Sequence, residues 1–276
     1  ILIKLNEFED KHLLNVKKKR TPTEYFWTCT GSTILYLFNK FNLKDCTYLD
    51  SDIFFYSNPY EILNKVKKKS CLITKHNYSK TYDQSKTNGK FCVQFMYFKN
   101  NKFGKRILND WREDCIEWCY NRVEDGKFGD QKYLDLWPKK YGKQIKICNQ
   151  VGAGIAPWNS KDFNFKLIRG KIKLKNIKSK KKHNLIFFHF HELKFYSKFF
   201  VYIGNYKINK DCYDLIYKDY ARKYLKKLNE IRQLMNINKN ELFDSFGSGK
   251  IGLINLLKTI KNFKNMKNIN QNENNI

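Results

Sequence analysis

Two aspartates separated by one residue, Asp50 and Asp52, follow a short apolar segment of the chain. Residues 46–49 predict a buried strand, and a turn-forming Ser57-Asn58-Pro59 comes soon after. Carboxylates at positions i and i+2 beyond a strand point in the same direction. Such a pair suits a hard divalent cation that keeps open positions for phosphate oxygens. A solvated turn after a strand would carry the same residues, so the pair becomes specific only together with other motifs.

Two histidines end a second apolar segment, at residues 185–190, in the order Phe188-His189-Phe190-His191. The alternation puts both imidazoles on one face of the expected strand. Neutral imidazole is a common metal ligand, although a histidine that finishes a strand can also bond only to backbone. His76 is a weaker candidate, because it stands between an apolar segment and the polar, turn-rich residues 77–89.

The apolar patterns predict helices and strands that alternate along the chain. Strands are expected at residues 1–5, 46–49, 71–74, 91–98, 144–148 and 185–190, and helices at 8–19, 25–41, 59–66, 104–122 and 213–235. This alternation predicts a layered α/β fold with an at least partly parallel sheet. Ligands of such sheets bind at the carboxyl ends of strands, which is where the aspartates and the histidines lie.

The composition describes a basic globular protein. Of 276 residues, 42% are apolar and 16% aromatic, and 54 basic against 26 acidic residues give a net charge of +28. Only seven of the basic residues are Arg, and the lysines are scattered among abundant Asn, Ile, Phe and Tyr, as in a chain encoded by AT-rich codons. Readers of nucleic acid favour clustered Arg, so we expect no specific nucleic-acid partner. Nonspecific attraction to an anionic lipid or polymer stays open.

Cysteine usage and hydropathy favour a cytoplasmic location. The eight cysteines include no Cys-x-x-Cys pair, and we expect them to be buried as small hydrophobic residues. No apolar segment reaches the ~20 residues of a membrane span. Residues 251–263 form a basic amphipathic segment, which would either pack on the domain or lie on a membrane surface. The Asn-rich tail from Lys267 is expected to be disordered.

Five segments, taken in chain order, carry a family resemblance. They are Glu24-Tyr25-Phe26-Trp27-Thr28-Cys29, Thr47-Tyr48-Leu49-Asp50-Ser51-Asp52, Gly126-Lys127-Phe128-Gly129-Asp130-Gln131-Lys132-Tyr133-Leu134, Gly152-Ala153-Gly154-Ile155-Ala156-Pro157-Trp158-Asn159 and Phe188-His189-Phe190-His191. As an ordered set they resemble bacterial glycosyltransferases of the GT-A fold, in the nucleotide-diphospho-sugar transferase superfamily. The resemblance covers most of residues 21–191. Family members carry a base-binding first strand further upstream, so the resemblance implies that the chain, which opens on Ile1, is truncated at its N-terminus.

The resemblance implies an α/β, Rossmann-like GT-A catalytic domain over residues 1–205, with a mixed, mostly parallel sheet flanked by helices. Residues 206–276 would be a helical C-terminal extension with a disordered basic tail. The implied enzyme uses Mn²⁺ or Mg²⁺ to move a sugar from a nucleotide-diphospho-sugar donor to a glycan or lipid-linked acceptor in surface polysaccharide or lipooligosaccharide synthesis. It would work in the cytoplasm, where the lysine-rich surface would suit peripheral contact with an anionic inner membrane.

The resemblance also implies roles at the metal. Asp50, Asp52 and His189 would form the metal site, with His191 as the second choice for the histidine. Asp52 would bind the cation directly, whereas Asp50 would contact the donor ribose or a bound water.

Further roles concern the donor sugar and the acceptor. Asp130 and Gln131 would contact both, and Asp130 would be the general base if the reaction inverts the anomeric configuration, which the sequence leaves open. A sugar-binding or helix-capping role for Asp130 stays open. Gly152 and Gly154 would let the backbone approach the ligand closely, and Trp158 and Asn159 would form part of the acceptor rim.

One departure and three rival interpretations accompany the resemblance. Related transferases often have an asparagine on the strand that here carries Cys92 and Gln94. Haloacid-dehalogenase phosphotransferases also use Asp-x-Asp, but they need a later acidic pair, and no Asp-Asp occurs in this chain. A non-catalytic domain that binds sugar nucleotides or acts as a scaffold is the main alternative. A basic nucleic-acid-binding protein is the weaker one, because the chain has no Arg-rich cluster.

Overall fold

A computed structural model describes residues 1–195, 200–236 and 266–268 of the chain. The helices are α1 Lys11–Lys17, α2 Pro22–Lys40, α3 Tyr60–Leu63, α4 Lys102–Glu117, α5 Trp137–Tyr141, α6 Pro157–Ser160, α7 Lys210–Cys212 and α8 Lys218–Met235. The strands are β1 Asp45–Leu49, β2 Ile53–Phe55, β3 Cys71–Lys75, β4 Phe91–Lys99, β5 Ile145–Ile147, β6 Ala153–Ile155, β7 Phe163–Ile168, β8 Lys171–Asn176, β9 Lys182–Asn184, β10 Phe187–His189, β11 Leu193–Phe195, β12 Phe200–Ile203 and β13 Met266–Asn268. The predicted α/β class is confirmed.

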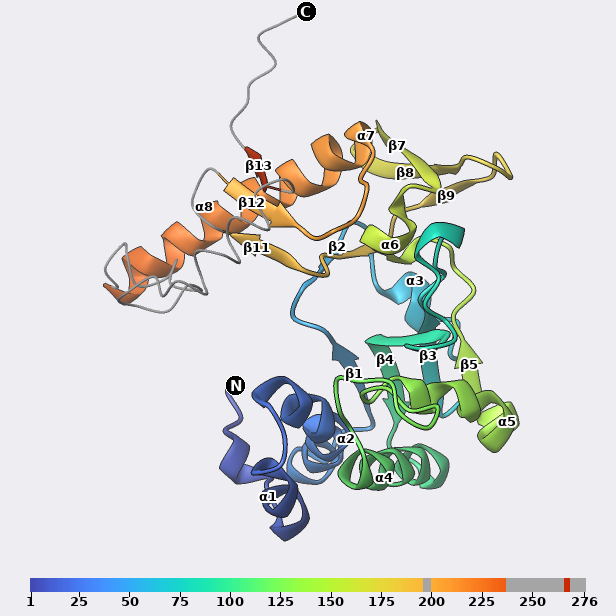
Figure 1. The fold of residues 1–276 in the computed structure, drawn as a ribbon, viewed down its shortest axis with the longest axis vertical. Coiled ribbons are helices and arrows are strands. Elements are labelled where there is room, and N and C mark those ends of the chain that lie inside the picture. The colour runs from blue at the N-terminus through green and yellow to red at the C-terminus, as the bar shows by residue number, and fades with distance from the viewer. Residues whose placement is uncertain (196–199, 237–265, 269–276) are drawn as a thin grey trace, which may run out of the picture.

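Two mixed sheets form the middle of the molecule (Figure 1). The first has the order β1-β4-β3-β5, in which β4 is antiparallel to both neighbours and β3 is parallel to β5. The second has the order β2-β10-β6, in which β10 is antiparallel to β2 and parallel to β6. The expectation of a mostly parallel sheet was therefore wrong. No α-helix lies between β3 and β4, so the chain returns antiparallel instead of crossing over.

Helices α2 and α4 cover one face of the first sheet (Figure 1). Helix α2 begins with a capping box between Thr21 and Glu24 and has a proline in its first turn. Trp111 of α4 stacks on Phe98 of β4 with ring centroids 6.3 Å apart. On the opposite face, Phe95 of β4 stacks on Phe187 of β10 at 5.6 Å and joins the two sheets.

Several expected element boundaries were wrong. Residues 1–5 were expected to form a strand, but Leu5–Glu7 is a 3-10 helix. The Glu7 carboxylate accepts a hydrogen bond from the Lys4 backbone at 2.8 Å and so closes a turn. Helix α4 ends at Glu117, five residues short of the expected end, because Trp118 adopts an extended conformation.

The C-terminal helices pack on the second half of the chain and share its core. Tyr220 of α8 stacks on Phe190 with ring centroids 4.0 Å apart. Met266–Asn268 pairs with β12, so the expected disorder was wrong for Lys267. Residues 251–263 and 269–276 lie outside the described residues. Within the described ranges, no helix has both the length and the apolar character needed to cross a bilayer.

The eight cysteines are all free thiols, and seven of them are buried. Cys71, Cys115 and Cys119 belong to the core between the first sheet and its helices. The expectation that the cysteines act as small hydrophobic residues is confirmed for these seven.

Among the glycines of the described residues, Gly152 leaves the least room for a side chain. A Cβ atom there would lie 1.7 Å from the carbonyl oxygen of Asn184. We expect Gly152→Ala to lower the free energy of unfolding by about 3 kcal/mol or more, because backbone would have to move. Urea denaturation measures this change. Gly31→Ala on α2, where the nearest atoms lie at 3.4 Å, is the control, and equal losses in both variants would contradict the explanation.

Candidate metal centre and pocket

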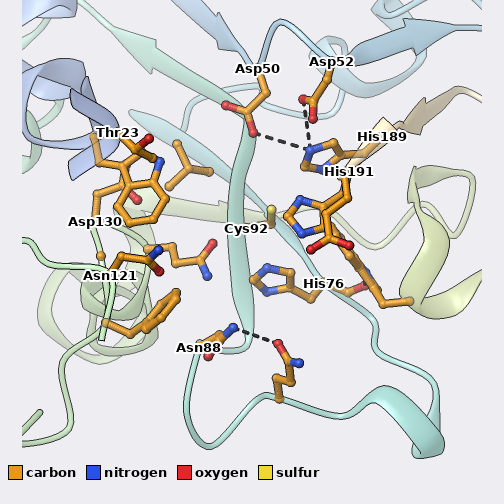
Figure 2. Close-up of a pocket in the computed structure, with 18 of the residues that line it drawn as sticks. Thr23, Asp50, Asp52, His76, Asn88, Cys92, Asn121, Asp130, His189 and His191 are labelled. Carbon is orange, nitrogen blue, oxygen red and sulfur yellow. Dashed lines mark hydrogen bonds and ion pairs between the residues drawn. The ribbon is translucent and has the colours of Figure 1, made fainter. Parts of the chain in front are cut away.

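A pocket of ≈ 700 Å³ lies beside the carboxyl ends of β1 and β10 (Figure 2). Its walls come from α2, the turn after β1, the segment after β3, the loop before the Lys132–Leu136 helix, and the residues around Trp158 and His189. This volume suits a small-molecule ligand or cofactor. Polar side chains that are distant in sequence therefore meet in one space, as the strand-end argument predicts.

Asp52, His189 and His191 form a cluster in this pocket with the composition of a metal centre. One ligand atom from each residue lies within 4.8 Å of the other two. Nε2 of His189 lies 3.1 Å from Asp52 Oδ1 and 3.9 Å from Asp50 Oδ2. A backbone hydrogen bond of 2.7 Å from Phe190 N to Asp52 O holds the two strand ends together. Asp50 thus borders the cluster without belonging to it.

Gln94, in the middle of β4, orients the histidine. Its Oε1 lies 2.8 Å from Nδ1 of His189. An amide oxygen only accepts hydrogen bonds, so Nδ1 carries a proton, and Nε2 hydrogen-bonds to Asp52 when it is protonated and offers its lone pair to a cation when it is not. The backbone carbonyl of Gln94 also accepts a hydrogen bond from Asp50 N at 3.0 Å. This arrangement fits a metal ligand, because ligating histidines are usually held through their other ring nitrogen.

Burial and the imidazoles set the charges of the cluster. Burial raises the pKa of Asp52, but the hydrogen bond and charge of His189 outweigh it and hold the pKa below its ordinary value. The pKa of Asp50 is raised by burial, which the charge of His189 and a hydrogen bond from Tyr48 offset only in part. Burial lowers the pKa of His191, as does the neighbouring His189. An ionised Asp52 beside a neutral His191 is the protonation state that binds a cation.

Asp130 lies across the pocket from the histidines (Figure 2). Burial, together with the charge of Asp50, raises the pKa of its carboxyl group to about 8. Nε1 of Trp111 donates to the backbone carbonyl of Asp130 at 2.8 Å and fixes this part of the loop. Gln131, not Asp130, occupies the N-cap of the following 3-10 helix and makes no side-chain cap. The capping alternative for Asp130 is therefore excluded, and Gln131 also lines the pocket.

The glycine-bearing loop contributes only Trp158 to the pocket wall. Trp158 makes edge contacts with His189 and His191, with ring centroids 5.3 and 5.4 Å apart. Asn159 is buried and donates to the backbone carbonyls of His76 and Gly154, so it braces the loop and lies outside the pocket wall.

Gly152 and Gly154 approach the protein's own atoms and do not line the pocket. Gly152 faces the backbone of Asn184, and a Cβ at Gly154 would lie 2.7 Å from Nε2 of Gln94. Gly154 also has a φ of +98°, which favours glycine. Its small size therefore leaves room for the side chain that orients His189.

His76 lines the pocket but is almost completely enclosed. Its ring stacks on Tyr78 with centroids 4.5 Å apart. Burial, with the charge of His189, lowers its pKa to about 3. A neutral His76 therefore forms part of the wall and is not a charged group of the site.

Sequence reasoning missed Gln94 as an orienting residue, and it missed Tyr48 and the aromatic wall. Tyr48 donates to Asp50 Oδ1 at 2.9 Å. Phe26, Trp27 and Phe128 line the pocket near Asp130. Gln94 did carry a signal, because a polar residue in the apolar run 91–98 must find a buried partner.

The role of Gln94 can be tested without an activity assay. Gln94→Met keeps the size of the side chain but removes the acceptor for His189 Nδ1, so we expect the affinity for Mn²⁺ to fall about 10- to 100-fold. Calorimetric titration of the purified protein with Mn²⁺ measures this. Gln150→Met, which removes an amide hydrogen bond to Glu61 O outside the pocket, is the control. An unchanged affinity in Gln94→Met would contradict the orienting role.

Comparison with known proteins gives two relatives whose names state no function. The chain is 29% identical over 195 residues to the uncharacterized protein YfnD of Bacillus subtilis (strain 168), a match that covers 68% of the chain and 60% of YfnD. It is also 29% identical over 197 residues to the uncharacterized protein YfnF of the same organism, covering 68% of the chain and 63% of YfnF. The chain thus spans less than two thirds of each relative. No family model matches it.

Proposed function

We propose that this chain is the catalytic part of a metal-dependent glycosyltransferase of the GT-A type. It would move a sugar from a nucleotide-diphospho-sugar to a hydroxyl group of a glycan or lipid-linked acceptor. The observation that supports this best is the convergence of Asp52, His189 and His191 within 4.8 Å in a pocket whose opposite wall carries Asp130. The ordered motifs that resemble the family supply the same residues.

Asp52, His189 and His191 would hold the cation in this proposal. A divalent cation there supplies positive charge to the departing diphosphate. Two imidazoles and one carboxylate form a softer ligand set than oxygen alone, so Mn²⁺ is favoured over Mg²⁺. Asp50 Oδ1 accepts a hydrogen bond from Tyr48. The Asp50 carboxylate would accept a second hydrogen bond, from a hydroxyl group of the nucleotide-sugar.

Asp130 would act as the base of an inverting reaction. The acceptor hydroxyl gives its proton to the Asp130 carboxylate while its oxygen bonds to the anomeric carbon and the bond to the diphosphate breaks. A pKa of about 8 lies near a usual working pH, which is where a general base is most effective. Phe26, Trp27 and Phe128, on the same side of the pocket, offer apolar ring faces on which a sugar can pack.

The proposed partners are a nucleotide-sugar donor and a glycan or lipid-linked acceptor used in surface polysaccharide synthesis. The proposed location is the cytoplasm, with peripheral contact to the inner face of the membrane. Specific nucleic-acid binding is not proposed, and a scaffold domain that binds sugar nucleotides without turnover is the alternative.

One observation favours a second candidate. Two histidines and one carboxylate also form the ferrous site of non-haem oxygenases. The proposal of a transferase is preferred because Asp50 and Asp130 add two more carboxylates to the same pocket. Dioxygen consumption in the presence of Fe²⁺ would support the oxygenase instead.

Release of nucleoside diphosphate tests the proposed activity. The purified protein is incubated with UDP-, GDP- and dTDP-sugars, with and without Mn²⁺ and simple glycan acceptors. We expect release with at least one donor that requires Mn²⁺ and is lost in Asp52→Asn. Asp45→Asn, at the exposed start of the strand that precedes Asp52, is the matched control. Release that is equal in wild type and Asp52→Asn would contradict the proposal.

A further inference from the structure

The sheet β7-β8-β9 lies outside the pocket and concentrates positive charge. Residues 163–184 contain eight lysines and one arginine and no aspartate or glutamate. A codon bias toward lysine does not explain this, because 26 acidic residues are spread over the rest of the chain. Figure 1 shows this sheet at the end of the molecule opposite α1, α2 and α4.

One face of this sheet is buried and the other carries the lysines. Phe165, Ile172 and Leu174 pack into the core of this half of the chain. On the outer face, Lys166 lies directly opposite Lys173, and Lys175 opposite Lys182. Like charges in such positions repel each other and destabilise a sheet. Within the described part of the chain, no carboxylate forms an ion pair with these lysines.

The end of β7 adds one apolar side chain to the charged face. Ile168 lies opposite Lys171 in the register, on the lysine face, and is 46% exposed. Leu167 is 59% exposed but lies opposite Ile172, so it belongs to the other face of the sheet. Arg169 and Gly170 form the turn itself, with φ of +49° and +71°. An exposed isoleucine is thus bordered by cations on the lysine face.

We propose that the outer face of β7-β8-β9 docks on an anionic lipid bilayer. Lysines opposite phosphate headgroups relieve their mutual repulsion, and Ile168 enters the boundary between headgroups and acyl chains. Nucleic acid fits less well, because it offers no apolar partner to the isoleucine, and the sheet carries a single arginine for bidentate contacts. The inference assigns a surface to the membrane contact of the proposed function, and it does not rest on the transfer reaction.

Sedimentation with vesicles tests the proposal. The full chain is mixed at low salt with vesicles of phosphatidylglycerol and phosphatidylcholine, or of phosphatidylcholine alone. We expect binding only to the anionic vesicles. Replacing Lys166, Lys171 and Lys175 with glutamine should weaken it on the order of a hundredfold. Ile168→Ser should weaken it about fivefold or more, through lost apolar burial.

Matched variants separate this surface from general charge. Lys65→Gln, Lys102→Gln and Lys105→Gln together remove the same charge from exposed lysines near α3 and α4 and should leave binding within about twofold of wild type. Thermal melting checks that all variants are folded. Equal losses of binding to anionic vesicles in both triple variants would overturn the proposal. So would tighter binding to an RNA homopolymer than to vesicles, with Ile168→Ser neutral toward both.

Discussion

Asp52→Asn is expected to lower the affinity of the protein for Mn²⁺ at least about a hundredfold. The substitution keeps the shape of the side chain but removes the charge of the only carboxylate in the three-residue cluster. It also removes the anionic partner 3.1 Å from His189 Nε2. Calorimetry or the electron paramagnetic resonance of free Mn²⁺ measures the affinity directly.

Two comparisons make this result specific. Asp45→Asn makes the same change of charge at the exposed start of β1 and should bind Mn²⁺ as wild type does. His189→Ala should lose at least as much affinity as Asp52→Asn, since both residues belong to the same cluster. If Asp52→Asn bound Mn²⁺ within about twofold of wild type, the assignment of the metal centre would fail.

Asp130→Asn is expected to change activity and stability in opposite directions. Removal of the proposed general base should lower kcat on the order of 10²- to 10⁴-fold. In wild type, kcat/KM should rise with pH until Asp130 is ionised, at about 8 in the free protein. The asparagine variant should lose this rise. Steady-state rates across the pH range provide the measurement.

The stability effect follows from the raised pKa of Asp130. Between its ordinary value of 3.8 and about 8, the folded protein binds a proton that the unfolded chain releases. Stability therefore falls as pH rises through this window, by up to about 1.4 kcal/mol per pH unit, and levels off above it. Asp130→Asn binds no such proton. The free energy of unfolding of this variant, relative to that of wild type, should therefore increase as pH rises through the window.

Urea denaturation at several pH values, in the absence of metal, tests this second effect. Asp45→Asn, an exposed position, should follow the pH dependence of wild type. Stability curves of Asp130→Asn and wild type that run parallel from acidic to alkaline pH would contradict a buried, protonated Asp130.

The sequence predicts elements better than it predicts their arrangement. Helix α2 and strands β1, β3 and β4 lie within a few residues of their expected positions, because apolar period and capping residues are local signals. The direction of β4 between β1 and β3 is decided by pairing across the sheet, which no local pattern encodes.

The same limit applies to the site. The aspartates and histidines were expected at strand ends, and the structure brings Asp52, His189 and His191 together. The orienting role of Gln94 was not predicted, because it depends on a partner 95 residues away along the chain. Gly152 was expected to let the backbone approach a ligand. A glycine in the sequence indicates a close approach but does not identify the approaching group. In the structure that group is the backbone of Asn184.

The most direct test of a metal-dependent nucleotide-sugar site is the melting temperature of the full chain with Mn²⁺ and UDP, separately and together. Ligands that bind only the folded protein raise the melting temperature by mass action, here by about 5 °C or more at saturating concentrations. We predict a rise that requires both ligands and disappears in Asp52→Asn but not in Asp45→Asn. A cooperative melt that stays unchanged with Mn²⁺ and with each of UDP, GDP and dTDP in its presence would contradict the proposed function.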